Sequence, residues 1–179
     1  SDGNLGSMCG NGARCSVKFA QNNKIVSDKT LFNAFDGNHR ANIHNNIVSL
    51  SMKDVSDIKT FGEDLFLDTG SPHYVKIVKN LENFDVYNEG KLIRNSNEFF
   101  KHGVNVNFVK IISEKEFEVR TFERGVEDET LSCGTGVTAV ALSMHYLNIT
   151  SLNNLKIKTK GGVLDVKFIQ NNNRYEKII

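Results

Sequence analysis

The sequence predicts an α+β fold of two pseudo-symmetric halves, each a mixed sheet wrapped around a central helix. One observation is a repeated motif: residues 9–13 read CGNGA and residues 133–137 read CGTGV. Apolar residues at helical spacing follow each copy, so each half is expected to contain one helix. Most other apolar segments alternate with polar residues as strands do, which favours sheets around those helices.

The first copy of the motif begins a helix that is followed by hairpin-like strands. Apolar residues at positions i, i+4 and i+7 predict a helix over residues 10–21. The tripeptide Asp36-Gly37-Asn38 is a hairpin signal. Strands are predicted on both sides of this signal and once more after it, at residues 30–35, 39–44 and 47–52.

The second half is expected to follow a polar connection at residues 54–64. This boundary divides the chain into residues 1–54, a C-terminal remnant of the first half-domain, and residues 55–179, the second half-domain. Apolar residues at i, i+3, i+4 and i+7 predict a helix after Cys133, and a weaker pattern suggests one over residues 85–94. Strands are predicted at residues 65–67, 74–78, 104–112, 116–122, 155–159 and 163–168.

The position of the first motif suggests that the first half is truncated. Far fewer residues precede Cys9 than lie between the expected boundary and Cys133. The chain begins at Ser1 rather than Met, and a turn signal, Asp2-Gly3-Asn4, follows at once. We therefore expect that a long N-terminal stretch is absent from this sequence.

Composition and charge exclude several classes of protein. The 179 residues carry 22 Lys and Arg against 21 Asp and Glu, and this net charge of +1 without a basic run argues against a dedicated nucleic-acid binder. No apolar stretch reaches the length of a membrane span, and no signal peptide is visible. Three cysteines do not make a disulfide framework, so free thiols in a reducing cytoplasm are expected.

The repeated cysteines suggest acid–base chemistry. A cysteine directly before a helix lies among free backbone N–H donors and the positive end of the helix dipole, which lower a thiol pKa. Two thiols from two related halves can lie on opposite faces of one carbon, so one removes a proton while the other supplies one. The N–H groups of Gly10-Asn11 and Gly134-Thr135 are then expected to stabilise charge that develops on the substrate.

Several longer strings resemble diaminopimelate epimerases through essentially the whole chain. They are MCGNGARC at residues 8–15, GSPHYV at 70–75, VNVNFV at 104–109, and ERG at 123–125 ahead of TLSCGTG at 130–136. The resemblance implies the two-half fold and inversion of LL-2,6-diaminopimelate to the meso isomer, in lysine and cell-wall precursor biosynthesis. It also implies an amino-acid substrate and a reaction without pyridoxal phosphate or metal. A homodimer stays open.

The same resemblance assigns roles to residues of this chain. The implied catalytic residues are Cys9 and Cys133, and His73 is a candidate auxiliary residue that orders a thiol. The implied substrate-binding residues are Gly10, Asn11, Ser71, Asn105, Glu123, Arg124, Gly134 and Thr135. Ser71 departs from the family, because many members have Asn at this position. The pair Glu123-Arg124 can present a carboxylate to an ammonium group and a guanidinium to a carboxylate.

Other interpretations remain open at this stage. The chain could be an inactive member of the same fold that only binds small molecules, or a related two-cysteine amino-acid racemase such as a proline racemase. A redox module is weakened because no Cys-x-x-Cys is present. A structural zinc site would need a second pair of ligands beside Cys9 and Cys15. Cys15 is expected to be a packed thiol inside the first helix.

Overall fold

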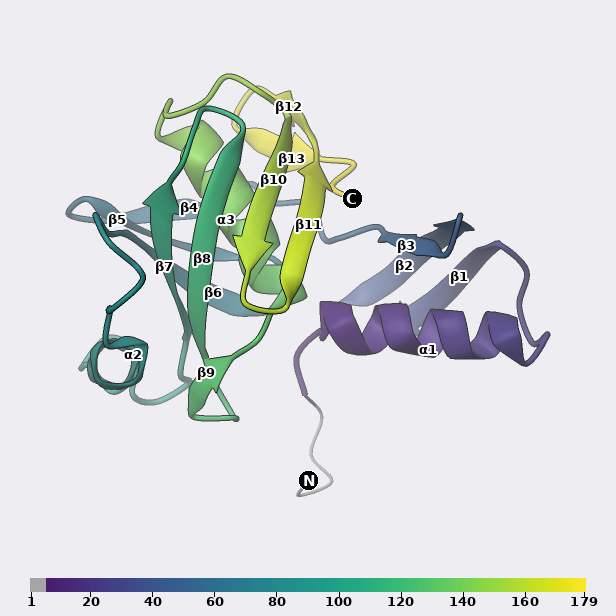
Figure 1. Ribbon diagram of the computed structural model, residues 1–179, viewed down its shortest axis with the longest axis horizontal. Helices are drawn as coiled ribbons and strands as arrows, with labels where there is room; N and C mark the ends of the chain where they lie inside the picture. Colours follow the sequence, from purple (N-terminus) through teal and green to yellow (C-terminus); the bar gives the residue numbers. More distant parts are fainter. Residues whose placement is uncertain (1–5) are drawn as a thin grey trace.

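The computed structural model describes residues 6–179, so the turn expected at Asp2-Gly3-Asn4 lies outside the described residues. The described chain contains three helices and thirteen strands arranged in two unequal parts (Figure 1). No helix in this range is long and apolar enough to cross a membrane.

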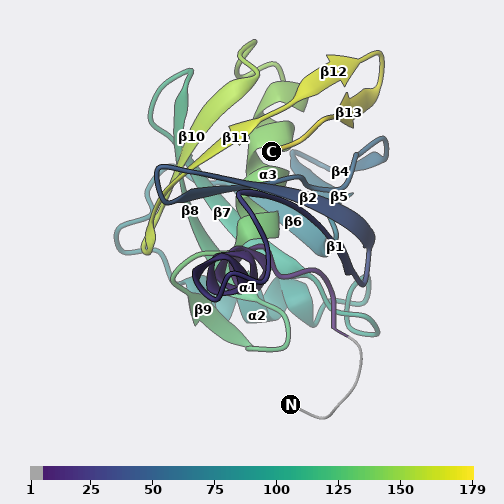
Figure 2. The same ribbon diagram turned by 90° about the vertical axis from the view of Figure 1, so that its right-hand side faces the viewer.

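The smaller part is built on helix α1 (Gly10–Asn22). Its three strands are β1 (Lys29–Ala34), β2 (Gly37–His44) and β3 (Ile47–Leu50). They form an antiparallel sheet in the order β1-β2-β3, and α1 packs against one face of it, seen from the side in Figure 1 and end-on in Figure 2. The first half was predicted to be a truncated mixed sheet, and the described part of it contains antiparallel pairs only. Short hairpins join these strands, and a short hairpin connects antiparallel neighbours only.

The larger part is an eight-stranded mixed sheet. Its order is β11-β10-β8-β7-β6-β5-β4, and β9 pairs with β8. The strands are β4 (Ile58–Phe61), β5 (Asp64–Asp68), β6 (Pro72–Ile77), β7 (Asn105–Ile111), β8 (Glu116–Glu123), β9 (Asp128–Thr130), β10 (Asn154–Thr159) and β11 (Gly162–Lys167). The pairs β6/β7 and β10/β8 are parallel. Helix α2 (Val86–Arg94) connects β6 to β7, as a parallel pair requires.

Helix α3 (Gly134–Tyr146) lies inside the curve of this sheet (Figure 1). The predicted apolar stripe suggested one buried face, but every residue from Gly134 to Met144 is buried. Strands β5, β6, β7, β8, β10 and β11 all contact this helix. A helix that is apolar on all sides is typical of a fully enclosed core helix, so the stripe understated its burial.

Two further elements complete the chain. Strands β12 (Ile169–Asn171) and β13 (Arg174–Glu176) form a hairpin whose turn contains Asn172 and Asn173. Val55 forms an isolated bridge with Tyr175 of this hairpin. The division of the chain into half-domains at residue 55 stays a prediction.

The expected connection at residues 54–64 contains a strand, so that prediction is wrong in part. Strand β4 pairs with β5 at the edge of the large sheet. Only Ile58 and Phe61 at its ends are half-buried, while Lys59 and Thr60 between them are exposed. An edge strand of this kind lacks the clear alternation that a pattern search requires.

Candidate active site

The repeated motif builds the same local structure twice. Cys9 is the N-cap residue of α1, with φ −113° and ψ 102°, and Cys133 is the N-cap residue of α3, with φ −123° and ψ 114°. Both backbones are extended, and both helices begin at the following glycine. Each cysteine therefore lies among the free N–H groups of a helix start, as the sequence predicts.

The two helix starts touch each other through glycine backbone. A Cβ added at Gly10 would lie 3.0 Å from Gly134 Cα, and a Cβ added at Gly134 would lie 2.9 Å from Gly10 Cα. A side chain larger than hydrogen would push the helices apart at either position. The positive ends of both helix dipoles therefore meet at one place.

A cavity of about 390 Å³ lies at this junction. It takes residues 6–11 from the N-terminal side of α1 and all its other residues from the larger part. The sequence-predicted site residues that line it are Cys9, Gly10, Asn11, Ser71, Asn105, Glu123, Arg124, Cys133, Gly134 and Thr135. The structure therefore brings together every predicted site residue except His73, which lies behind the cavity wall.

The two thiols have different surroundings. Cys9 is exposed, and its sulfur accepts a hydrogen bond from the Gly12 N–H at 3.3 Å. The Cys133 side chain is buried, and its sulfur lies 3.4 Å from Thr135 Oγ1. Burial raises the pKa of Cys133 to about 11, and the hydrogen bond from Thr135 opposes that rise. The predicted lowering of the thiol pKa is therefore wrong for Cys133, because desolvation outweighs the helix start.

A network of hydrogen bonds forms another wall of the cavity. Arg124 Nη2 donates to Ser7 Oγ at 3.3 Å, and Ser7 Oγ lies 3.2 Å from Ser71 Oγ. Asn105 Nδ2 donates to Ser71 Oγ at 2.8 Å, while Asn105 Oδ1 accepts from the Arg124 backbone N–H at 2.9 Å. Hydrogen bonds therefore link four residues that are distant from one another in the sequence. Sequence reasoning missed Ser7, which carries no signal of its own.

Arg14 is a second residue that sequence reasoning did not include in the site. Its guanidinium donates to the Asn11 side chain, and Asn11 Nδ2 donates to the Ser132 carbonyl at 2.7 Å. Burial lowers the pKa of Arg14, and the nearby cysteines oppose that shift. The charge of Arg14 lies close enough to both helix starts to favour a thiolate. Its place in the string CGNGAR was the signal that could have found it.

His73 belongs to β6 and is completely buried. Its Nε2 lies 2.8 Å from Thr135 Oγ1, and it reaches the Cys133 sulfur only through that hydroxyl. Burial and the charge of Arg124 lower the pKa of His73 to about 3. The imidazole is therefore neutral near pH 7.

Cys15 lies away from this site. It is exposed on α1, so the predicted packed position is wrong. Ser16 and Phe19, which lie near it on the helix, are also exposed. Among residues 6–179, no group of three or more His, Cys, Asp or Glu side chains is arranged to hold a metal ion.

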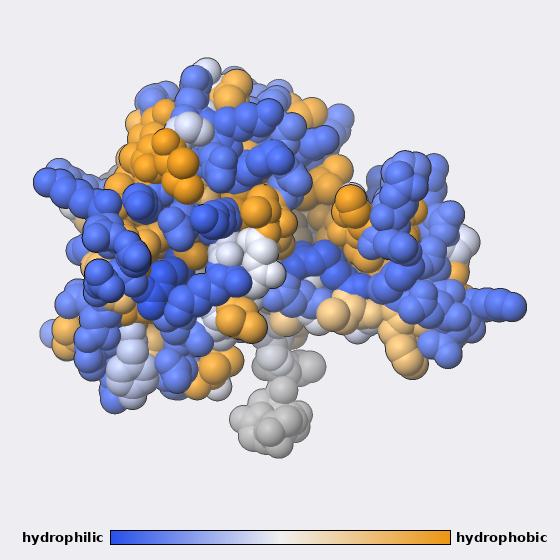
Figure 3. All heavy atoms as spheres, viewed as in Figure 1, coloured by the Kyte–Doolittle hydropathy of each residue, from blue (hydrophilic) through white to orange (hydrophobic). Residues whose placement is uncertain are grey.

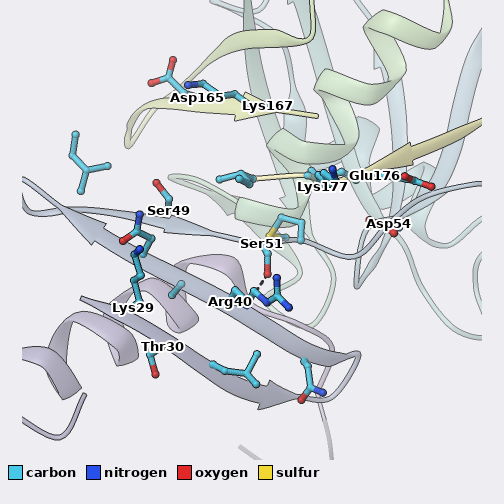
Figure 4. A pocket seen from close by; sticks show the side chains of 18 of the residues that line it. Lys29, Thr30, Arg40, Ser49, Ser51, Asp54, Asp165, Lys167, Glu176 and Lys177 are labelled. Carbon is cyan, nitrogen blue, oxygen red and sulfur yellow. Dashed lines mark hydrogen bonds between the residues drawn. The ribbon is translucent and has the colours of Figure 1, made fainter. Parts of the chain in front are cut away.

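A larger cavity of about 1560 Å³ opens between the small sheet and the C-terminal strands. Figure 3 shows the molecule hollowed there, with hydrophobic residues on both sides. Lys29 and Arg40 line it from the small sheet, and Asp165 and Lys167 line it from β11 (Figure 4). This cavity contains none of the predicted site residues, so the smaller one is the candidate active site.

Comparisons with known proteins point to one family. The family model described as "Diaminopimelate epimerase" matches residues 65–178. A diaminopimelate epimerase of Flavobacterium psychrophilum is 50% identical in an alignment of 179 residues, which covers 99% of this chain and 70% of that protein. One of Aquifex aeolicus is 40% identical over 94% of this chain and 64% of that protein. The chain therefore spans about two thirds of the length of these curated relatives.

Solved structures agree on the fold. A "probable proline racemase" from Agrobacterium radiobacter K84 has a TM-score of 0.68 at 15% identity, over 96% of this chain and 63% of that chain. A hydroxyproline epimerase from Agrobacterium vitis has a TM-score of 0.65 at 13% identity, over 96% of this chain and 62% of that chain. Likeness at such low identity concerns architecture alone, and it confirms the predicted α+β class.

Proposed function

We propose that the protein interconverts LL- and meso-2,6-diaminopimelate by inverting one α-carbon, because this chain belongs to the diaminopimelate epimerase family. This isomerase reaction belongs to lysine and cell-wall precursor biosynthesis. The observation that carries the proposal is the junction of two helix starts, with one N-cap cysteine each, at a single cavity. The near-neutral charge also fits a small-molecule substrate better than a nucleic acid.

In the proposed cycle, the two thiols exchange one proton with the substrate. Burial favours the neutral form of Cys133, so it begins as the proton donor and Cys9 begins as the thiolate base. Cys9 removes the α-proton from one face, and the electron pair is delocalised into the adjacent carboxylate. Cys133 then delivers its proton to the opposite face. The protein is left with Cys9 as thiol and Cys133 as thiolate, ready for the reverse direction.

The helix starts stabilise the charge that develops on the reacting carboxylate. The N–H groups at Gly10-Asn11 and Gly134-Thr135 line the cavity from both sides. The loss of one comparable donor in other enzymes costs about 3–4 kcal/mol of transition-state stabilisation. Arg14 adds a positive charge behind these donors.

The other end of diaminopimelate carries a second amino acid group. Glu123 and Arg124 line the cavity side by side, and they can pair with an ammonium and a carboxylate respectively. We therefore assign them to recognition of this distal group. A single-headed amino acid such as proline lacks it, which separates this function from that of a two-cysteine racemase.

Proton exchange tests this proposal directly. LL-diaminopimelate incubated with the protein in D₂O should gain deuterium at one α-carbon as the meso isomer appears, whereas L-proline should gain none. The reduced protein should have the highest rate. Exchange into proline, or activity that requires the oxidised protein, would contradict the assignment.

A further inference from the structure

A chain of four buried polar side chains lies behind Cys133. It runs from Thr121 of β8 through Asn107 of β7 and His73 of β6 to Thr135 of α3. All four side chains are buried, and His73 and Asn107 are 0% exposed. The proposed reaction gives a role to Thr135 but none to His73, Asn107 or Thr121. A fully satisfied polar chain in a core is costly to assemble and can fix one arrangement of its members.

The hydrogen-bond partners of Asn107 fix the orientation of its amide. The backbone carbonyl of Tyr74 can only accept, so the atom of Asn107 that lies 2.9 Å from it is the donor Nδ2. Thr121 Oγ1 lies 3.0 Å from the opposite atom, Oδ1, and donates to it. The second hydrogen of Nδ2 therefore points at His73 Nδ1, 3.0 Å away.

This orientation decides the tautomer of His73. Its Nδ1 accepts a hydrogen bond and so carries no proton, which places the proton of the neutral ring on Nε2. Nε2 then donates to Thr135 Oγ1 at 2.8 Å. The oxygen of Thr135 already accepts this bond, so its own hydrogen is directed at the Cys133 sulfur, 3.4 Å away. Each donor in the chain points toward the sulfur.

Gly136 of helix α3 allows the Asn107 side chain to approach the helix closely. A Cβ added at Gly136 would lie 2.6 Å from Asn107 Oδ1, so a larger residue at this position would displace the amide. The second glycine of the Cys-Gly-x-Gly motif therefore has a purpose beyond the helix start. It makes room for the residue that orients the histidine.

We propose that Asn107 is a positioning residue, which holds His73 as the Nε2–H tautomer so that the Thr135 hydroxyl donates to Cys133. The inference rests on the proposed function, in which this buried sulfur becomes a thiolate once in every cycle. A thiolate without a donor would be strongly disfavoured in such a site. The Thr135 hydroxyl adds a side-chain donor to the backbone N–H of Gly136, and none of the four side chains carries a charge near neutral pH.

The native protein gives the first test. Nitrogen-15 NMR of the histidine rings distinguishes a protonated ring nitrogen from an unprotonated one. His73 should show an unprotonated Nδ1 and a protonated Nε2 near neutral pH. A protonated Nδ1 would overturn the proposal.

A double-mutant cycle gives the second test. Asn107→Asp replaces the donor with a carboxylate that accepts from Nδ1–H, so Nε2 becomes an acceptor and takes the Thr135 hydrogen away from the sulfur. In protein with Cys9 and Cys15 both replaced by Ser, alkylation of Cys133 by iodoacetamide at a fixed pH should slow about tenfold, because a hydrogen bond to a charged group is lost. Thr135→Val should slow alkylation similarly, and Thr135→Ser should retain most of the reactivity.

The double variant Asn107→Asp/Thr135→Val distinguishes an effect that acts through Thr135 from a direct effect of the new carboxylate on the sulfur. If Asn107 acts through Thr135, Asn107→Asp should slow alkylation little further in the Thr135→Val background. Additive effects would mean that the carboxylate acts on the sulfur directly and would overturn the proposal. None of these measurements needs substrate. A failure of epimerisation alone would therefore count against the proposed function and not against this chain of residues.

Discussion

Helices α1 and α3 begin with the same motif and the same N-cap geometry, yet their surroundings differ. Eleven residues of α3 are buried, against only Gly10 and Val17 in α1. The exposure of the two thiols differs in the same way, since Cys9 is exposed whereas Cys133 is only 8% exposed. The motif therefore fixes the backbone at each cysteine, while the surrounding elements decide how easily its sulfur ionises.

The largest expected effect is on activity. Cys9→Ser and Cys133→Ser should each abolish epimerisation, because a serine hydroxyl does not ionise near neutral pH and cannot replace either thiol. Cys15→Ser should keep most of the activity, since Cys15 is exposed away from the cavity. Initial rates with LL-diaminopimelate provide the measurement. Equal losses at all three cysteines would instead indicate a structural role.

The second prediction compares the stability contributions of the two helices. Leu142→Ala in α3 should lower the free energy of unfolding by about 2–5 kcal/mol, because it leaves a cavity in an enclosed core. Phe19→Ala in α1 removes a side chain that is 66% exposed and should change it by less than about 0.5 kcal/mol. Urea denaturation measures both. Similar losses would mean that α1 is enclosed in solution.

The third prediction concerns alkaline pH. Burial raises the pKa of Cys133 from 9.0 to about 11, so between these values the folded protein holds a proton that the unfolded chain has lost. The stabilisation is fully present below pH 9 and decreases as the pH rises toward 11, by about 2–3 kcal/mol in total. Cys133→Ser should lack this part of the slope, and Cys9→Ser should keep it. The free energies of unfolding of the unsubstituted protein and of both variants, measured across this pH range, test these expectations.

The fourth prediction tests the contact between the helix starts. Gly10→Ala places a Cβ 3.0 Å from Gly134 Cα, so it should cost about 1–3 kcal/mol of stability and reduce turnover. Gly6→Ala is the matched control for stability, because a Cβ there would meet nothing within 4 Å. Thermal unfolding should distinguish the two variants. A fully active and stable Gly10→Ala protein would refute the close contact.

The smallest expected effect is at Ser7. Ser7→Ala removes a partner of Arg124 and Ser71, so KM for diaminopimelate should rise about twofold to tenfold with little change in kcat. Cys15→Ser serves as the control on the same segment. A loss confined to kcat would place Ser7 closer to the reacting carbon than the network suggests.

Much of this arrangement could be predicted because it is local. The string Cys-Gly-x-Gly identifies both the N-cap cysteine and the glycine that the close contact requires. The two site cysteines and the two helix starts could therefore be predicted from the sequence. The hairpin at Asp36-Gly37 and the helix after Asp85 were predicted from similarly local signals. Site residues in longer strings were implied by the family resemblance.

The rest depends on contacts between distant segments. The stripe on α3 could not show that six strands enclose the helix, and the raised pKa of Cys133 follows from that enclosure. Asn107 and Thr121 look like ordinary polar residues of strands until the sheet places them behind His73. Ser7 gains its partners only when the N-terminal segment crosses to the larger part.

The contact between Gly10 and Gly134 also constrains how a family with this site can evolve. Because no atom larger than hydrogen separates the two backbones there, neither helix can move closer, and any added carbon can only move them apart. A substitution at either glycine would therefore alter the spacing of the two helix starts and, with it, of the two thiols. Ser71 lines the same cavity without taking part in this contact, so a substitution there can change the lining and leave the helix starts in place.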